Sequence, residues 1–257
     1  MALGVCILIV ARGSDYLLID ISNSYAKFAF ASTGRVLAPT RIPTSELSSG
    51  VVARFLGERS VGKMVVSSVV PAKNSAILKA AGKVNVLWLD WKLKLGVGID
   101  YPNPQSIGAD RLANAAAVTA LCGFPAIVVD FGTAVTFDIV SARRAYIGGV
   151  IAPGLEAMTN FLYRRTALLP KLSLKEPRRA VGKSTIQAML SGAVFGYRGL
   201  VREILTQVRT EQFSHKKVHV VATGGYARLI AQRLPEIDVV HPNLTLQGLR
   251  IVANLND

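Results

Sequence analysis

The chain is poor in cysteine, histidine and acidic residues, and each scarcity excludes a class of protein. Its two cysteines, Cys6 and Cys122, lack the spacing of a metal or redox motif, so we expect a reduced, cytosolic protein without a disulfide framework. Three histidines form no Ser-His-Asp or Cys-His arrangement with their sequence neighbours. His215 and His219 stand in a strand context rather than on one helical face, so we do not expect them to bind a metal.

Long hydrophobic runs are also missing. The longest apolar stretches are broken by Pro125 and Asp130, or stop after about eight residues at Arg12, which is too short to span a bilayer. Residues 2–11 have no basic leading region and no clear cleavage site, so we expect no signal peptide. The 257 residues, 51% hydrophobic and 18% charged, are typical of a globular protein with one large or two modest domains.

Negative charge is the third deficit, because 30 Lys and Arg stand against 16 Asp and Glu, for a formal net charge of +14. Such a balance favours anionic ligands and raises their encounter rate. The basic residues are spread along the chain, and the small clusters at 164–165, 175–183 and 216–217 are not interleaved with aromatic residues. Nucleic-acid binding, which needs a basic surface with stacking platforms, is therefore not the predicted function.

The order of predicted elements indicates an α/β protein with two similar halves. In the first half the apolar patterns predict strands over 17–22, 27–31, 36–42, 63–69 and 84–89, with helices over 45–56 and 72–81. A loop rich in Pro and Gly, residues 96–108, then leads into an Ala-rich helix over 109–121. This alternation of strands and helices predicts a mixed sheet flanked by helices.

The same pattern restarts after Pro125. Strands over 126–129, 134–140 and 145–151 mirror the opening three, and a long helix over 184–208, a strand over 218–222 and two short helices follow. We therefore predict two domains, 1–118 and 119–257, that pack closely with a cleft between them.

Two short loops carry most of the chemical information. Asp20-Ile-Ser-Asn-Ser and Asp130-Phe-Gly-Thr-Ala each follow one apolar strand and precede another. A carboxylate at a strand end can hold a cation or its water, while backbone N–H groups and hydroxyls reach phosphate oxygens. Two such loops about one domain apart predict a duplicated fold that grips phosphate between its halves.

One tempting motif is excluded. Gly182-Lys-Ser-Thr looks like the end of a P-loop, but that motif requires Gly at position 177, where this chain has Pro177. Proline also removes a backbone N–H donor that a phosphate cradle would use. The chain is therefore not predicted to be a P-loop nucleotide-binding protein.

Gly108-Ala-Asp-Arg stands at the start of the Ala-rich helix. Asp110 at this place can simply complement the helix dipole, or it can accept a proton from a substrate hydroxyl while Arg111 grips an anionic group. The preceding loop around Tyr101 could wall the same pocket. Gly224-Gly225, between a strand and a helix, would let the adenosine side of a nucleotide approach the backbone, although such turns are common.

Together these motifs resemble the type III pantothenate kinases, members of the superfamily of acetate kinase, sugar kinases, Hsp70 and actin. The most specific matches are Gly108-Ala-Asp-Arg, Asp130-Phe-Gly-Thr-Ala-Val-Thr-Phe-Asp and Tyr146-Ile-Gly-Gly-Val-Ile-Ala-Pro-Gly, and the order of later motifs agrees. The resemblance implies two actin-like (ribonuclease H-like) domains with an active-site cleft between them. It also implies ATP-dependent phosphorylation of pantothenate, the first step of coenzyme A biosynthesis, in the cytoplasm.

The resemblance assigns roles residue by residue. Asp110 would be the general base, and Asp130 would hold a monovalent cation, K⁺ or NH₄⁺, beside a divalent cation, Mg²⁺, that accompanies ATP. Members of the family are usually homodimers whose second subunit helps to close the substrate pocket. The ATP phosphates would contact Asp20, Ile21, Ser22, Asn23, Ser24, Tyr25, Ala26, Lys27 and Thr133. Pantothenate would contact Tyr101, Gly108, Ala109, Asp110, Arg111 and Thr185.

One departure from the family pattern keeps two alternatives open. The first loop of the family reads Asp-x-Gly-Asn-Thr, whereas this chain has Ser22 in place of Gly and Ser24 in place of Thr. One alternative is a non-catalytic regulator on the same fold, similar to accessory transcription factors. The other is a kinase of the superfamily that acts on a sugar.

Overall fold

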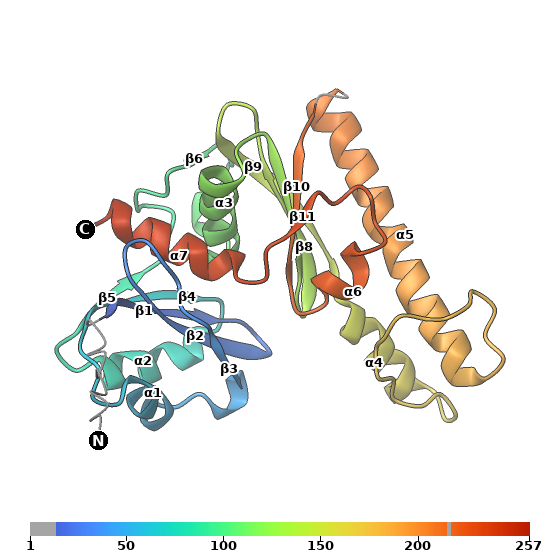
Figure 1. Ribbon diagram of the computed structural model, residues 1–257, viewed down its shortest axis with the longest axis horizontal. Helices are drawn as coiled ribbons and strands as arrows, with labels where there is room; N and C mark the ends of the chain where they lie inside the picture. Colours follow the sequence, from blue (N-terminus) through green and yellow to red (C-terminus); the bar gives the residue numbers. More distant parts are fainter. Residues whose placement is uncertain (1–13, 215–216) are drawn as a thin grey trace, which may run out of the picture.

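The computed structural model describes residues 14–214 and 217–257, and every structural statement concerns these ranges. The predictions for residues 2–11, Cys6 and His215 fall outside them. Two mixed β-sheets stand side by side with helices on their faces (Figure 1). No helix in the described ranges is both long and apolar enough to cross a membrane.

The first sheet has five strands in the order β3-β2-β1-β4-β5. Its first three strands form an antiparallel meander, and β4 and β5 continue the sheet in parallel. The strands are β1 (Ser14–Ile21), β2 (Tyr25–Ala31), β3 (Thr40–Pro43), β4 (Val61–Ser68) and β5 (Asn85–Trp88). Two helices, α1 (Ser49–Leu56) and α2 (Asn74–Ala81), cover one face of this sheet.

The second sheet repeats this topology. Its order is β11-β10-β7-β8-β9-β6, so β9-β8-β7-β10-β11 matches β3-β2-β1-β4-β5 strand for strand. The predicted duplication is therefore confirmed. The strands are β6 (Gly98–Ile99), β7 (Ala126–Phe131), β8 (Ala134–Val140), β9 (Ala145–Pro153), β10 (His219–Gly224) and β11 (Val239–Val240).

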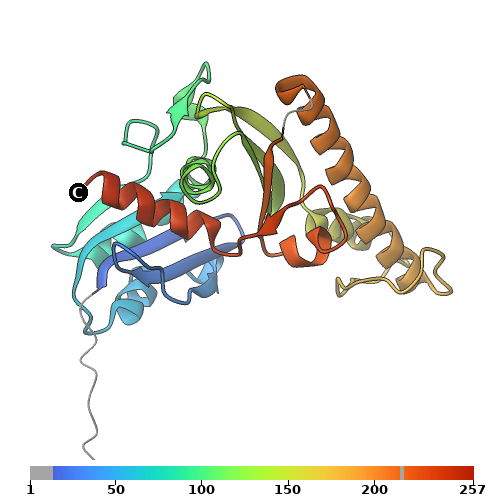
Figure 2. The ribbon, with the colours of Figure 1, turned by 45° about the horizontal axis from the view of Figure 1, so that its top comes forward.

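Helices α3 (Ala109–Leu121) and α7 (Leu244–Leu255) lie between the two sheets, as both ribbon views show (Figures 1 and 2). Small residues let them approach closely, because a Cβ at Gly248 would lie only 2.0 Å from the carbonyl oxygen of Ala113. The outer side of the second sheet is covered by α5 (Thr185–Phe213) and α6 (Ala227–Ala231), and α4 (Leu155–Arg165) packs on the lower part of α5.

Strand alternation decides which way the two aspartates point. Leu17 and Ile19 of β1 pack against α1 and α2, whereas Leu18 packs on the opposite side with α3 and α7. Because side chains alternate along a strand, Asp20 shares the inner side with Leu18. By the same alternation Asp130 shares the inner side of the second sheet with Val128. Both carboxylates therefore face the space between the sheets.

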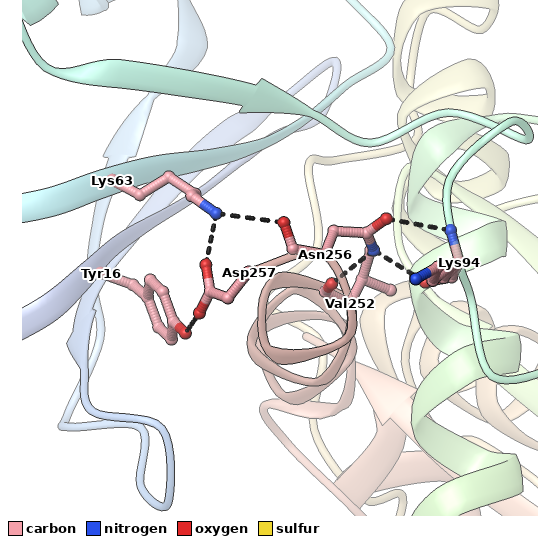
Figure 3. Close-up of polar contacts among 6 residues, drawn as sticks. All are labelled: Tyr16, Lys63, Lys94, Val252, Asn256 and Asp257. Atoms are coloured by element: carbon pink, nitrogen blue, oxygen red, sulfur yellow. Dashed lines mark hydrogen bonds and ion pairs between the residues drawn. The ribbon is translucent and has the colours of Figure 1, made fainter.

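The end of α7 returns to the first sheet (Figure 3). The Asp257 carboxylate accepts hydrogen bonds from the Tyr16 hydroxyl and the Lys63 ammonium. The Asn256 side chain pairs with the backbone of Lys94, donating to its carbonyl at 2.9 Å and accepting from its N–H at 3.1 Å. Since α7 begins beside the second sheet, it connects the two halves of the molecule.

Several predicted boundaries are wrong at the edges of elements. Residues 36–42 are not one strand, because β3 begins only at Thr40, and Pro39 cannot donate a ladder hydrogen bond. The helix predicted over 45–56 begins at Ser49, where the Ser48 side chain caps it by accepting from the Val51 N–H. The helix predicted over 184–208 runs on to Phe213.

The domain division between residues 118 and 119 stays a prediction. Strand β6 precedes residue 118 but pairs with β9 of the second sheet, through Gly98 opposite Ala145. Helix α3, which spans the predicted boundary, contacts both β4 and β7.

Candidate active site

A cavity of about 660 Å³ lies between the two halves and is lined by both acid loops. The loops meet directly at the cavity wall, because the Ser24 and Thr133 hydroxyl oxygens are 2.7 Å apart, within hydrogen-bond distance. The predicted facing of Asp20 and Asp130 is thus present in the structure. Of the predicted residues, the cavity is lined by Asp20, Ser22, Asn23, Ser24, Tyr25, Lys27, Asp110, Asp130, Thr133, Gly224 and Gly225.

Asp20 is almost fully buried at the end of β1, with 2% of its surface exposed. Burial raises the pKa of its carboxyl to about 6, an effect that the nearby Lys27 opposes and the charges of Asp110 and Asp130 reinforce. The Lys27 ammonium lies 3.9 Å from one carboxylate oxygen. The other oxygen, Oδ1, has no hydrogen-bond partner within the described ranges. A buried, unpartnered carboxylate oxygen at a cavity wall fits a cation or a water bound to one.

Asp110 lies in the first turn of α3, where Gly108 makes room for it. A Cβ at position 108 would lie 2.6 Å from Asp110 Oδ1, so glycine allows the carboxylate to fold back over the helix start. The same oxygen accepts the Arg111 N–H at 2.9 Å. Burial, and then the charge of Asp130, raise the pKa of Asp110 above its ordinary value. A carboxyl of raised pKa at a cavity wall can serve as a proton acceptor near neutral pH.

Asp130 is held by neutral groups. Asn114 Nδ2 of α3 donates to Asp130 Oδ2 at 3.2 Å, and Asn114 Oδ1 in turn accepts from the Thr245 hydroxyl at 2.9 Å. Gly224 is needed beside it, because a Cβ there would lie 2.5 Å from Asp130 Oδ1. Its φ of 92° is also a value that favours glycine.

No group of three or more His, Cys, Asp or Glu side chains that could hold a metal ion exists in the part of the chain that the structure describes. A protein cage for a divalent cation usually offers several carboxylates. Asp130, with the amide of Asn114 beside it and Thr133 and Thr136 in the same cavity lining, instead fits a monovalent cation, or a divalent cation that arrives with a phosphate ligand. The donor set around Asp130 is therefore compatible with the predicted role.

Some predicted residues do not line the cavity. Ile21 and Ala26 are buried in the core of the first half, so only their backbone is available to a ligand. Ala109 is buried in the core between the sheets. Thr185 is exposed at the start of α5, away from the cavity of its own chain.

Tyr101 and Arg111 belong to a second group of side chains beside Asp110. The Tyr101 ring meets the edge of Tyr146 with ring centroids 6.1 Å apart. The guanidinium of Arg111 lies 5.7 Å from the Tyr146 ring centroid. Its Nε donates to Asp138 Oδ1 at 2.6 Å.

The sequence analysis missed four residues of this region: Asn114, Asp138, Glu156 and Tyr226. A usable signal existed for the first two. Asn114 is four residues after Asp110 in a run of alanines, hence on the same helix face, and Asp138 is a charge in an otherwise apolar strand pattern. Glu156 lines the cavity and accepts a hydrogen bond of 2.9 Å from the Tyr226 hydroxyl, a contact between segments far apart in the chain that no local pattern indicates.

Two sheets of the same strand order, with an acid loop of each facing a shared cavity, define an actin-like fold. A solved structure of a putative 2-dehydro-3-deoxygalactonokinase from Sinorhizobium meliloti shares this fold, with a TM-score of 0.59 at 15% identity over 93% of this chain and 96% of that one. A putative Baf family transcriptional activator from Campylobacter jejuni does so as well, with a TM-score of 0.58 at 21% identity over 93% and 98%.

The sequence decides the family. The profile of type III pantothenate kinases matches residues 16–207. A type III pantothenate kinase of Akkermansia muciniphila is 49% identical over 243 residues, which cover 94% of this chain and 99% of that protein. This chain belongs to the type III pantothenate kinase family.

Proposed function

We propose that this protein transfers a phosphoryl group from ATP to the hydroxyl of pantothenate, the first step of coenzyme A biosynthesis. The observation that carries the proposal is the cavity in which Asp20, Asp110 and Asp130 converge, in a chain of this family. Phosphoryl transfer depends mainly on positioning and on neutralising phosphate charge, and the cavity supplies groups for both.

Asp110 is the proposed general base. Its carboxylate lines the cavity and has a raised pKa, so it can accept the proton of the attacking hydroxyl. The alternative role, stabilising the start of α3 through the helix dipole, needs no access to a cavity. The exposure of Asp110 to the cavity therefore favours the catalytic role.

The two acid loops are the proposed binding site for the ATP phosphates. The hydroxyls of Ser22, Ser24 and Thr133 and the Lys27 ammonium surround the same space. Gly224 and Gly225 line its other side, where the open backbone suits the adenosine part of the nucleotide.

The cations of the proposal have separate positions. Asp130 would hold a monovalent cation, K⁺ or NH₄⁺, and the unpartnered oxygen of Asp20 would face Mg²⁺ or its water. When bound, these cations would neutralise charge on the phosphates. Asn114 fixes the orientation of Asp130, and Lys27 offsets the charge of Asp20 before any ligand is present.

Pantothenate would lie against Asp110 and the neighbouring group of Tyr101, Gly108, Ala109 and Arg111. Arg111 follows Asp110 on α3, and a guanidinium pairs well with a carboxylate. The proposal thus places the hydroxyl of the acceptor at Asp110 and its carboxylate at Arg111. We also propose that the protein acts in the cytoplasm, where ATP is supplied.

A homodimer would account for Thr185. This residue is exposed on a part of the chain that also exposes apolar side chains, including Phe161 (60% exposed), Leu168 (90%) and Val181 (70%). Such a patch is typical of an interface between subunits. We propose that a second copy covers it and brings Thr185 to the pantothenate side of the partner's cavity.

A coupled ADP-release assay tests the proposed reaction. Purified protein should release ADP only when ATP, pantothenate and a monovalent cation are all present. Turnover on sugars instead of pantothenate would support the sugar kinase alternative. Absence of turnover together with tight DNA binding at physiological salt would support the other alternative, a non-catalytic regulator on the same fold.

Mixed dimers test the role of Thr185. An inactive Asp110→Asn chain mixed with a Thr185→Ala chain should regain activity, because one of the two sites would then combine intact Asp110 and intact Thr185. If no activity returns although mixed dimers form, Thr185 does not act across the interface.

A further inference from the structure

The guanidinium of Arg111 is fixed by a carboxylate that no solvent reaches. Asp138 stands on β8 with none of its surface exposed, and its Oδ1 accepts the Arg111 Nε–H at 2.6 Å. Arg111 itself keeps only 15% of its side-chain surface exposed. Burying such a pair costs free energy, because both charges lose their contact with water. Apolar residues at the same two positions would often stabilise the fold as well or better, so stability alone does not explain the pair.

The backbone of β9 is shaped around this pair. Gly149 stands opposite Asp138 in the sheet register. A Cβ at position 149 would lie 2.3 Å from Arg111 Nη2 and 1.9 Å from the Phe137 carbonyl oxygen. Only a glycine at this position leaves room for the guanidinium so close to the strand. The ring of Tyr146 packs on it as well, so its orientation is restricted by backbone, ring and carboxylate together.

The pair is not fully satisfied by the protein. Within residues 14–214 and 217–257, neither Arg111 Nη2 nor Asp138 Oδ2 has a hydrogen-bond partner, although both are buried. Burial raises the pKa of the Asp138 carboxyl to about 7, and only the charge and hydrogen bond of Arg111 favour its ionised form. An incompletely paired ion pair next to a substrate cavity is typical of a group held ready for a ligand.

We propose that Asp138 is a positioning residue, which holds Arg111 in the orientation that binds the carboxylate of the acceptor substrate. Asp138 thereby sets the preference for an acid acceptor over an uncharged one. The inference rests on the proposed function, in which Arg111 meets the carboxylate of pantothenate. Asp138 does not touch the substrate itself, since Arg111 and the β9 backbone lie over it.

The test compares pantothenate with pantothenol, in which an alcohol replaces the carboxylate. Asp138→Asn keeps the shape and one acceptor oxygen but removes the charge. The ratio of kcat/KM for pantothenate to kcat/KM for pantothenol should fall at least ~10-fold in this variant. The loss should come from a higher KM for pantothenate, with kcat changed less than ~3-fold and pantothenol kinetics nearly unchanged.

Glu176→Gln is the matched control. Glu176 pairs with a different arginine, the buried Arg198, at 2.6 Å, and neither residue lines the cavity. This variant should lose stability without changing the ratio between the two acceptors. An unchanged or higher ratio in Asp138→Asn, or an equal loss with both acceptors, would overturn the proposal. A wild-type protein that phosphorylates neither acceptor would instead overturn the proposed function.

A second measurement uses the wild-type protein and does not depend on the folding of Asp138→Asn. The side-chain Nε–H resonance of Arg111, assigned by its loss in Arg111→Lys, should exchange slowly with water because Asp138 accepts it in a buried place. Pantothenate, and not pantothenol, should shift this resonance. Exchange as fast as that of an exposed arginine would show that Asp138 does not hold Arg111.

Discussion

The two acid loops occupy equivalent places in two copies of one sheet, yet their carboxylates have different neighbours. On the neighbouring parallel strand, β4 or β10, both aspartates have a hydroxyl residue opposite them: Asp20 pairs with Ser67 and Asp130 with Thr223. On the antiparallel side they differ: Asp20 stands opposite Lys27, whereas Asp130 stands opposite Thr136. Duplication thus kept the backbone and changed the charge balance.

The difference separates two tasks. Asp20 is buried and partly neutralised by a lysine of its own sheet. Asp130 is oriented by the amide of Asn114 and has the neutral Thr136 opposite it in the sheet. We infer that the first loop mainly places the phosphates with their Mg²⁺ and the second mainly holds the monovalent cation. Variants of the two loops can test this division.

The largest effect should come from Asp110, which belongs to neither loop. Asp110→Asn should lower kcat at least ~100-fold while leaving the affinity for ATP nearly unchanged, because it removes the base and keeps both loops. Steady-state kinetics and an ATP titration measure the two quantities. Near-normal turnover in this variant would show that the loops suffice and that the proposed base is wrong.

The next largest effects should come from removing the carboxylate of one acid loop at a time. Asp130→Ala should abolish the dependence of turnover on K⁺ concentration, because it removes the only charged ligand proposed for that ion. Asp20→Asn should retain the K⁺ response but raise the KM for ATP about tenfold, because it removes the carboxylate proposed to face the Mg²⁺ that accompanies ATP. If both variants lose the K⁺ response alike, the two loops do not divide the work.

Lys27 should set the pH dependence of the first loop. Since the pKa of Asp20 is about 6, kcat/KM for ATP should fall as the pH drops through 6 and Asp20 takes up a proton. The Lys27 ammonium opposes the increase that burial causes in the pKa of Asp20. Lys27→Met should therefore raise this pKa further and move the acidic limb of the pH profile to higher pH. Lys79→Met, which removes an exposed lysine of α2, is the control and should leave the profile unchanged.

The smallest effect is expected at the position where this chain departs from its family. Among the described residues only Arg144 and Ser214 combine a side chain with a positive φ, so Ser22 adopts its loop without left-handed strain. Ser22→Gly should therefore change the KM for ATP less than ~2-fold. The matched change Gly132→Ser should also be tolerated, because a Cβ there would meet nothing closer than 3.4 Å. A large gain of affinity in Ser22→Gly would show that the serine obstructs phosphate.

Sequence patterns predicted the parts of the molecule that depend on local rules. Both acid loops, the meander β7–β8–β9 and the start of α3 were predictable, since apolar alternation, glycine and proline mark them. The two-residue strand β6 was not, because it exists only through pairing with β9. The same limit applies to Glu156 and Tyr226, whose contact joins segments far apart in the chain. Thr185 was predicted as a contact, but the pattern could not indicate that its own chain keeps it away from the cavity.

The position of helix α7 affects how the two halves of the molecule can unfold and move. The helix begins at Leu244, and the hydroxyl of its second residue, Thr245, donates to Asn114 beside Asp130. Two residues after its end, Asp257 accepts hydrogen bonds from Tyr16 and Lys63 of the first sheet. Helix α7 and the residues after it therefore contact both halves, so the halves cannot separate without breaking the packing of α7. On heating, both sheets should therefore unfold in one calorimetric transition. Opening and closing of the cleft should be a hinge rotation of the two halves about the α3–α7 pair.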